Sequence, residues 1–401
     1  MTKVPSLCGM ENCTGCMACY NVCPKGAISM KEGEKGFLYP NIDSSKCILC
    51  NACQNVCPSL RKKKYKTEGQ EYYGFKHSDL DIRLRSSSGG FFSWLSDFVL
   101  ENNGVVYGAL YDEKLFVVHG RAETKNERDK MCGSKYVQSF IGDAFKNVKN
   151  DLLAGKKVLF TGTPCQCEAV LEYLGAGFDT SNLITMDFIC EGVASPLVFE
   201  KYKKYESRKY KRLGQLEYVN FRDKNRYNYR HKPILARRLV LGFLNKSTGV
   251  SKLVYDGLGN SRYLDSMFSG LLQRDACIDC KFHTYDRASD FTCGDFHRYH
   301  GSSDFKDEYG ISEVLANTEK AKAIIAKHIN ENEFLRCNKE DVWQPLLTGH
   351  IDVDCRKRNA FWKTYQKSGY KKATGLVMGK VYKRYAFHFL RTIKIKMKKY
   401  I

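Results

Sequence analysis

Half of the cysteines in this chain lie in two closely spaced runs near its start. Nine of the 18 cysteines fall within the first 57 residues, and the blocks CTGCMACYNVCP (13–24) and CILCNACQNVCP (47–58) match at eight of twelve positions. Each block has the spacing C-x2-C-x2-C-x3-C-P. Three closely spaced thiolates bind three corners of one [4Fe–4S] cubane, and the fourth cysteine reaches a second cluster. The spacing therefore predicts two [4Fe–4S] clusters.

The same pattern assigns ligands to each cluster, and it resembles the two-cluster ferredoxins over residues 8–60. The expected ligands of the first cluster are Cys13, Cys16, Cys19 and Cys57, and those of the second are Cys47, Cys50, Cys53 and Cys23. The alternative, a structural zinc site, needs only four ligands, usually from two C-x2-C pairs. Cys8 falls outside both runs and is expected to be a spare thiol.

Strand and helix patterns alternate after the cysteine blocks, beyond a polar linker at residues 62–70. Strands are predicted at 71–75, 105–111, 115–120, 157–162 and 183–190, and helices at 91–103, 142–155 and 168–176. Such alternation predicts an α/β domain. Short strands are also predicted beside the cysteine blocks, at GAISM (26–30) and GFLYP (36–40).

Four segments of small or polar residues lie at the ends of these elements. They are RSSSGGFF (85–92), GSKYVQS (133–139), TGTPCQCEA (161–169) and DFICEGVASP (187–196). Backbone N–H groups at a helix N-terminus favour an anionic group such as a pyrophosphate, although Ser-rich helix caps are also common without a ligand. Loops at the carboxyl ends of strands are the usual ligand sites of α/β sheets.

The order of the segments carries a family resemblance. GSKYVQS, GTPCQ, a C-x-G ahead of Ser195-Pro196, FRDK (221–224), and the pair Cys277 and Cys280 ahead of GDF (294–296) follow one another. This order resembles the beta subunit family of coenzyme F420 hydrogenase/dehydrogenase, from about residue 8 to residue 350. The resemblance implies a ferredoxin-like N-terminus joined to a FAD-binding iron–sulfur domain. Some relatives act with deazaflavins, and others accompany surface-polysaccharide biosynthesis.

The resemblance also implies a third [4Fe–4S] cluster near the flavin. Its candidate ligands are Cys165, Cys190, Cys277 and Cys280, with Cys167 and Cys293 as rivals. Clusters carry single electrons, whereas a two-electron substrate takes a hydride, so a flavin fits between them. The candidate flavin contacts are Ser87, Ser88, Gly89, Gly90, Gly133, Ser134, Gln138, Gly162, Thr163 and Pro164. The candidate proton donors are Lys135, Tyr136, Glu191 and Asp295, with a turn or cap role favoured for Asp295.

Positive charge is concentrated in the C-terminal segment. The formal net charge is +21, and residues 371–401 hold ten Lys or Arg and no acid. Apolar residues recur there at every fourth position from Val377 to Met397, which predicts a basic amphipathic helix. Two interpretations stay open: peripheral contact with an anionic membrane, or packing on the domain with the basic face in solvent. The basic stretch 201–238 would suit an acidic substrate, an acidic cofactor tail or a donor protein.

Several other function classes find no support in the sequence. No run of 18 apolar residues is present, and the first residues, MTKVPSLCGMENC, lack the apolar region of a signal peptide. No helix-turn-helix, RNP or C2H2 pattern occurs, so nucleic acid is not an expected partner. We expect a cytoplasmic protein that contacts the inner face of the membrane if its C-terminal tail binds lipid.

Together these patterns predict an α+β ferredoxin-like dicluster domain (1–62), an α/β flavin-binding domain (70–350) and a basic helical C-terminal tail (356–401). The expected function is that of an iron–sulfur flavoprotein oxidoreductase. It would pass electrons from a donor such as ferredoxin through [4Fe–4S] clusters to FAD and a small substrate, with surface-polysaccharide biosynthesis as one setting. The alternative is a non-catalytic electron-transfer subunit of a larger redox complex.

Overall fold

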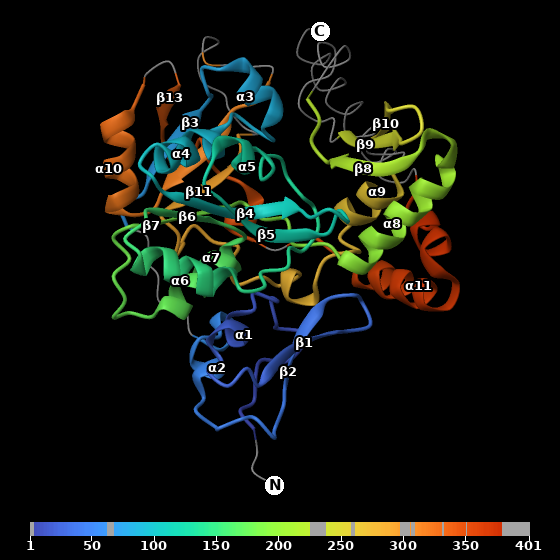
Figure 1. Ribbon diagram of the computed structural model, residues 1–401, viewed down its shortest axis with the longest axis horizontal. Helices are drawn as coiled ribbons and strands as arrows, with labels where there is room; N and C mark the ends of the chain where they lie inside the picture. Colours follow the sequence, from blue (N-terminus) through green and yellow to red (C-terminus); the bar gives the residue numbers. More distant parts are fainter. Residues whose placement is uncertain are drawn as a thin grey trace, which may run out of the picture.

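The computed structural model describes residues 4–61, 68–224, 238–257, 261–296, 305, 309–330, 333–349 and 351–378. Figure 1 shows three parts: a small N-terminal domain, a large part built on a wide sheet, and a smaller lobe beside it. Most of the predicted linker at 62–70 and the predicted helix beyond Met378 lie outside the described residues.

The N-terminal domain combines one β-hairpin with two short helices. Strands β1 (Ile28–Glu32) and β2 (Leu38–Ile42) pair antiparallel, which confirms the strands predicted beside the cysteine blocks. Helices α1 (Ala18–Val22) and α2 (Ala52–Asn55) each begin inside one cysteine run. The two halves of the domain therefore repeat the same local structure.

The large part is built on a mixed eight-stranded sheet in the order β13-β3-β12-β11-β7-β6-β4-β5. Its central strands run parallel: β4 (Val105–Tyr111), β6 (Val158–Thr161), β7 (Leu183–Phe188) and β11 (Phe291–Asp295). The flanking strands pair antiparallel: β5 (Val117–Ala122), β12 (Ser312–Ala316), β3 (Glu71–Phe75) and β13 (Phe334–Cys337). The strands and helices predicted between residues 71 and 190 are confirmed, with ends that differ by a few residues.

Helices cover both faces of this sheet because alternate residues of each strand point to opposite sides. Val158 and Phe160 pack with α6 (Ala144–Leu153) and α7 (Pro164–Leu174). Leu159 packs on the other face, with α4 (Phe91–Leu100) and α10 (Glu319–His328). The short helices α3 (Leu80–Arg85) and α5 (Lys125–Asp129) lie beside α4 (Figure 1). Because β6, β7 and β11 are neighbouring parallel strands, their carboxyl ends meet at one edge of the layered structure.

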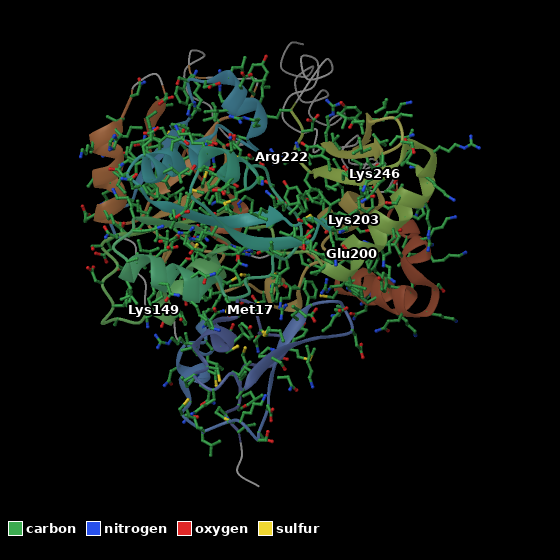
Figure 2. All side chains as sticks on the ribbon, in the orientation of Figure 1. Met17, Lys149, Glu200, Lys203, Arg222 and Lys246 are labelled. Carbon is green, nitrogen blue, oxygen red and sulfur yellow. The ribbon has the colours of Figure 1, made fainter. Side chains whose placement is uncertain are left out.

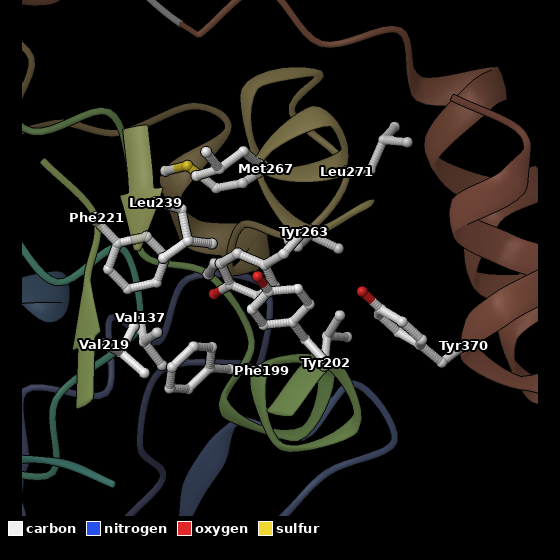
Figure 3. Close-up of a cluster of buried hydrophobic side chains, with 14 of the residues drawn as sticks. Val137, Phe199, Tyr202, Val219, Phe221, Leu239, Tyr263, Met267, Leu271 and Tyr370 are labelled. Atoms are coloured by element: carbon white, nitrogen blue, oxygen red, sulfur yellow. The ribbon is translucent and has the colours of Figure 1, made fainter. Parts of the chain in front are cut away.

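The smaller lobe was not predicted as a separate sheet. Strands β8 (Gln215–Asn220), β9 (Arg238–Asn245) and β10 (Val250–Gly257) form an antiparallel sheet, with helices α8 (Pro196–Lys209), α9 (Arg262–Phe268) and α11 (Cys355–Gly375) beside it. Figure 3 shows its aromatic core, in which Tyr202 and Phe199 of α8 meet Tyr263 of α9. The predicted α/β domain thus does not describe the antiparallel sheet beyond residue 196. Hydrophobic alternation does not reveal whether neighbouring strands run parallel or antiparallel.

The first part of the predicted tail packs into this same core. Phe361, Trp362 and Tyr370 of α11 are buried there, and so is Val377 just beyond the helix. Gly369 interrupts the helical backbone with φ 76°. The predicted boundary at residue 356 therefore falls inside an element of the smaller lobe. Among the described residues, no helix has the length and apolarity to cross a membrane.

Candidate functional site

Two small cavities in the N-terminal domain each gather one of the predicted ligand sets. The first is lined by Cys13, Cys16, Cys19 and Cys57, and the second by Cys23, Cys47, Cys50 and Cys53. Cys8 also lines the first cavity, and its Sγ lies 3.7 Å from Sγ of Cys57. The spare thiol of the sequence is thus a neighbour of one ligand set, which spacing alone did not reveal.

The loop geometry explains why these thiols converge. Gly15 and Met17 in the first run have φ 70° and 60°, and Leu49 and Asn51, at the matching positions 34 residues later, have φ 57° and 58°. Left-handed residues let the backbone curl so that successive cysteines face a common centre. The repeat in the sequence is therefore also a repeat in backbone conformation.

The two ligand sets differ in their exposure to solvent. Cys13 and Cys16 are buried, and Figure 2 places Met17 at the boundary with the large part of the chain. Burial raises the pKa of Cys16 to about 12. By contrast, the Cys8 hydrogen bond, helped by the nearby Arg274 guanidinium, lowers the pKa of Cys13 to about 6. Cys50 of the second set is exposed, so this set is the outer one.

A third cavity is lined by four cysteines that are far apart in the sequence: Cys165, Cys190, Cys277 and Cys280. Cys165 opens α7 directly after β6, and Cys190 follows β7, so the carboxyl ends of adjacent parallel strands bring them together. Cys277 and Cys280 come from a 3-10 helix (Asp275–Cys277) and the turn that follows it.

Burial raises the pKa of all four of these thiols, to about 11 for Cys280. Such thiols become thiolates when a metal cluster binds them. Four thiolates on one zinc ion would crowd around it at about 2.3 Å each, whereas a cubane binds each cysteine at a separate iron. A set of four cysteines around one cavity has the donor chemistry of an iron–sulfur cluster.

The rival ligands lie elsewhere. Cys167 is fully buried on α7, and its Sγ faces the carbonyl oxygen of Met186 at 3.5 Å. Cys293 of β11 lines a different, larger cavity. Neither residue lines the four-thiol cavity.

The larger cavity, of about 290 Å³, lies at the carboxyl ends of the parallel strands. Of the predicted flavin contacts, seven line it: Ser87, Ser88, Gly90, Gly133, Ser134, Gly162 and Thr163. Gln138 and Pro164 line the four-thiol cavity instead. Gly89 lines neither cavity. A Cβ at this position would lie 2.0 Å from the carbonyl oxygen of Phe75. This glycine is needed for the close approach of its loop to the sheet.

The serine hydroxyls at this cavity bind other loops of the wall. Ser87 Oγ accepts from the backbone N–H of Ser134 at 2.6 Å and lies 2.8 Å from its Oγ. Ser88 Oγ donates to the carbonyl oxygen of Ile311 at 2.7 Å. These contacts hold the segment before α4 against the loop that carries Ser134. The hydroxyls of Ser87 and Ser88, two of the predicted flavin contacts, thus already have protein partners.

The candidate proton donors Lys135, Tyr136, Glu191 and Asp295 all line the larger cavity. Burial lowers the pKa of Lys135 to about 8. Its Nζ donates to the carbonyl oxygens of Met131, Cys132 and Gly133 at 3.0, 3.0 and 3.1 Å. Lys135 therefore holds the turn before it in shape.

An arginine joins two of these candidates. Arg222 donates to Asp295 Oδ2 at 2.7 Å, to the Tyr136 hydroxyl at 3.2 Å and to the Ser87 carbonyl oxygen at 3.0 Å. Figure 2 shows Arg222 between the large sheet and the smaller lobe. Asp295 is the last residue of β11 and pairs with this arginine, so its carboxylate does more than the turn or cap role expected for it. The sequence held one signal for Arg222, its place in the FRDK segment.

The cavities adjoin one another. Thr14 lines both the first N-terminal cavity and the four-thiol cavity. The four-thiol cavity and the larger cavity share five lining residues: Thr163, Gln166, Cys190, Gly192 and Val193. The first N-terminal cavity, the four-thiol cavity and the larger cavity thus follow one another, and each shares at least one lining residue with the next.

Comparisons with known proteins relate two parts of this chain to known families. Residues 155–341 match the family model that describes the C-terminal part of the coenzyme F420 hydrogenase/dehydrogenase beta chain, and residues 12–60 and 39–84 match two models of a 4Fe-4S dicluster domain. A chain from the xenon-derivatised F420-reducing [NiFe] hydrogenase complex of Methanosarcina barkeri is similar, with 16% identity over 78% of this chain and 91% of that chain and a TM-score of 0.42. No curated protein matches the chain. Over residues 155–341 the chain is thus related to the coenzyme F420 hydrogenase/dehydrogenase beta subunit family, and its N-terminal 4Fe–4S dicluster domain makes it an iron–sulfur protein.

Proposed function

We propose that this protein is an iron–sulfur flavoprotein oxidoreductase that takes single electrons at its N-terminal domain and delivers two to a small substrate. The observation that carries the proposal is the shared wall between the four-thiol cavity and the cavity of about 290 Å³. One-electron carriers need a two-electron partner close by to perform hydride chemistry. The shared wall supports such an arrangement in this chain.

The thiols of the first and second sets would hold the two clusters of the dicluster domain, and Cys165, Cys190, Cys277 and Cys280 would hold a third. Thr14 supports a short path between the inner set and the third set because it lines both cavities. A further contact supports the same proximity: Gln138, which lines the four-thiol cavity, donates to the Thr14 carbonyl oxygen at 3.0 Å.

The larger cavity is the proposed flavin and substrate site. Its volume of about 290 Å³ is near the lower end of the roughly 300–1,000 Å³ usual for small-molecule sites. Gly133 has φ 81° and would place a Cβ no closer than 3.9 Å to a neighbour, so its backbone faces open space. FAD, when bound there, would supply the conversion between one- and two-electron transfer.

Within this site Tyr136 is the proposed proton donor to substrate. Its hydroxyl accepts a hydrogen bond from Arg222 at 3.2 Å and therefore keeps its own proton available to the cavity. Asp295 holds the guanidinium in place at 2.7 Å. We assign Lys135 to the shape of the loop, because three carbonyl oxygens accept from its Nζ.

The outer thiol set is the proposed point of electron entry. Cys50 is exposed, and Ile48 and Leu49 beside it are 55% and 40% exposed, which forms a small apolar rim. Such a rim suits brief docking of a one-electron donor protein such as a ferredoxin, since weak redox encounters bury little surface.

Anaerobic purification, followed by reconstitution and counting of iron and flavin, tests the proposal. We expect about 12 iron atoms per chain, four for each of three clusters, and one FAD. A chain that holds about eight iron atoms and binds no added flavin would instead be a non-catalytic electron-transfer subunit. The setting in surface-polysaccharide biosynthesis is a separate part of the proposal, and loss of surface polysaccharide in a strain that lacks the gene would support it.

A further inference from the structure

Arg274 is a fully buried cation at the junction between the N-terminal domain and the rest of the chain. Its guanidinium donates to the backbone carbonyl oxygen of Cys13, to that of Leu38 at 2.9 Å, and to Oε1 of Gln138 at 2.9 Å. The same group also lies 3.4 Å from Sγ of Cys13. One side chain from the large part therefore contacts both the backbone and the thiol of a predicted cluster ligand.

The N-terminal domain is shaped to receive this guanidinium. Its central carbon lies 4.3 Å from the ring centroid of Tyr39 and 5.3 Å from that of Phe37. A Cβ at Gly15 would lie 2.6 Å from Arg274 NH1, so only glycine leaves the space. The matching position of the second repeat holds Leu49, which is 40% exposed. One of the four positions at which the two blocks differ is thus the place where the arginine enters.

Among the described residues, the hydrogen-bond partners of Arg274 include no carboxylate. They are three neutral oxygens and the Cys13 sulfur. A buried cation without a counter-charge is costly. Four thiolates on a [4Fe–4S]2+ core carry a net charge of about −2, and such a group at Cys13 would provide the missing negative charge.

We propose that Arg274 is a positioning residue that raises the reduction potential of the cluster held by Cys13 and so favours electrons at the inner end of the N-terminal domain. The guanidinium stabilises the added negative charge when one electron from an external donor changes the net charge from about −2 to −3, and no bond is broken. Net charge and hydrogen bonds to sulfur are among the factors that set such potentials.

Arg274 also fixes where this electron is held relative to the next thiol set. Its own carbonyl oxygen accepts from the backbone N–H of Cys277 at 3.0 Å, three residues along the chain. The residue thus binds Cys13 with its side chain and Cys277 with its backbone. This part of the inference rests on the proposed third cluster, whereas the effect on the Cys13 cluster does not.

A redox titration of the reconstituted full-length chain, with dithionite as reductant and EPR detection, tests the inference. In Arg274→Gln we expect the midpoint of one N-terminal cluster to fall by at least about 59 mV, a tenfold change for one electron, while the other stays in place. Arg274→Lys, which keeps the charge, should lie between Gln and the wild type. Lys35→Gln is the matched control, because Lys35 lies at the same junction but pairs with Asp275 at 2.7 Å. An unchanged midpoint in an iron-replete Gln variant would overturn the inference.

A second measurement uses only the unsubstituted protein. With 15N-labelled arginine, pulsed EPR of the reduced chain should show a 15N coupling, because NH2 of Arg274 lies 3.4 Å from the Cys13 sulfur. Absence of this coupling would refute the inference even if the Gln variant lost iron. Neither measurement requires flavin or a third cluster, so failure of the proposed function would be seen separately.

Discussion

Separate replacement of Cys165 and Cys167 by alanine gives the sharpest test of the four-thiol cavity. Both residues lie in the first turns of α7, two positions apart. Cys165 lines the cavity, whereas Cys167 faces the carbonyl oxygen of Met186 at 3.5 Å. Each substitution leaves a void the size of one sulfur, which costs about 1 kcal/mol. A protein stable by roughly 5–15 kcal/mol tolerates that loss, so the two variants should unfold at similar temperatures when both are freed of clusters, which themselves stabilise the fold.

Their iron contents should differ sharply. Cys165→Ala removes one of four ligands, and we expect about eight iron atoms per chain where the unsubstituted chain and Cys167→Ala hold about 12, four per cluster. Colorimetric iron assay and EPR of the dithionite-reduced proteins measure this difference, with thermal unfolding as the check on folding. Equal iron in the two alanine variants, or loss of iron only from Cys167→Ala, would refute the assignment.

Three further outcomes are expected. Gly15→Ala adds a Cβ 2.4 Å from Gln138 Nε2 at φ +70°, so the free energy of unfolding from urea titration should fall by more than the backbone strain of about 1–2 kcal/mol. Gly26→Ala is the control, because at φ +58° with nothing within 4 Å it carries the backbone strain alone. Equal losses of stability in the two variants would contradict the reasoning. Burial raises the pKa of Glu313 from 4.5 to about 8, so stability should decline by up to about 5 kcal/mol as pH rises through that window; urea titrations of Glu313→Gln should show a flatter decline. A chain ending at Met378 keeps Val377 in the core, so it should melt as the full chain does while binding anionic liposomes less; undiminished liposome binding would exclude the tail as a lipid contact.

The cysteine runs could be predicted because their chemistry is local. Each C-x2-C-x2-C loop is set by a few neighbouring residues, and the structure gathers each predicted set around one cavity. The four-thiol set came from family resemblance, and its convergence depends on β6 and β7 being adjacent parallel strands. Strand and helix alternation indicated an α/β domain but not the order of its strands.

Contacts between residues far apart in the sequence could not be predicted in this way. Arg274 and Cys13 are separated by 261 positions, and Arg222 and Asp295 by 73. The hydrophobic periodicity of the segments that carry these residues does not indicate that the residues meet. The smaller lobe was not predicted, although Leu239, Leu241 and Phe243 alternate along β9 and face its core.

The ion pairs at the base of the N-terminal domain have a consequence for biogenesis. Asp275 binds Lys35 at 2.7 Å and Arg358 at 2.6 Å, so three widely spaced stretches meet there. During synthesis, the cysteines of the first run leave the ribosome more than 300 residues before Arg358 does. Cys13 and Cys16 are thus open to solvent on the nascent chain, whereas the finished protein encloses them. The order of the residues therefore allows a cluster to be inserted before α11 is made.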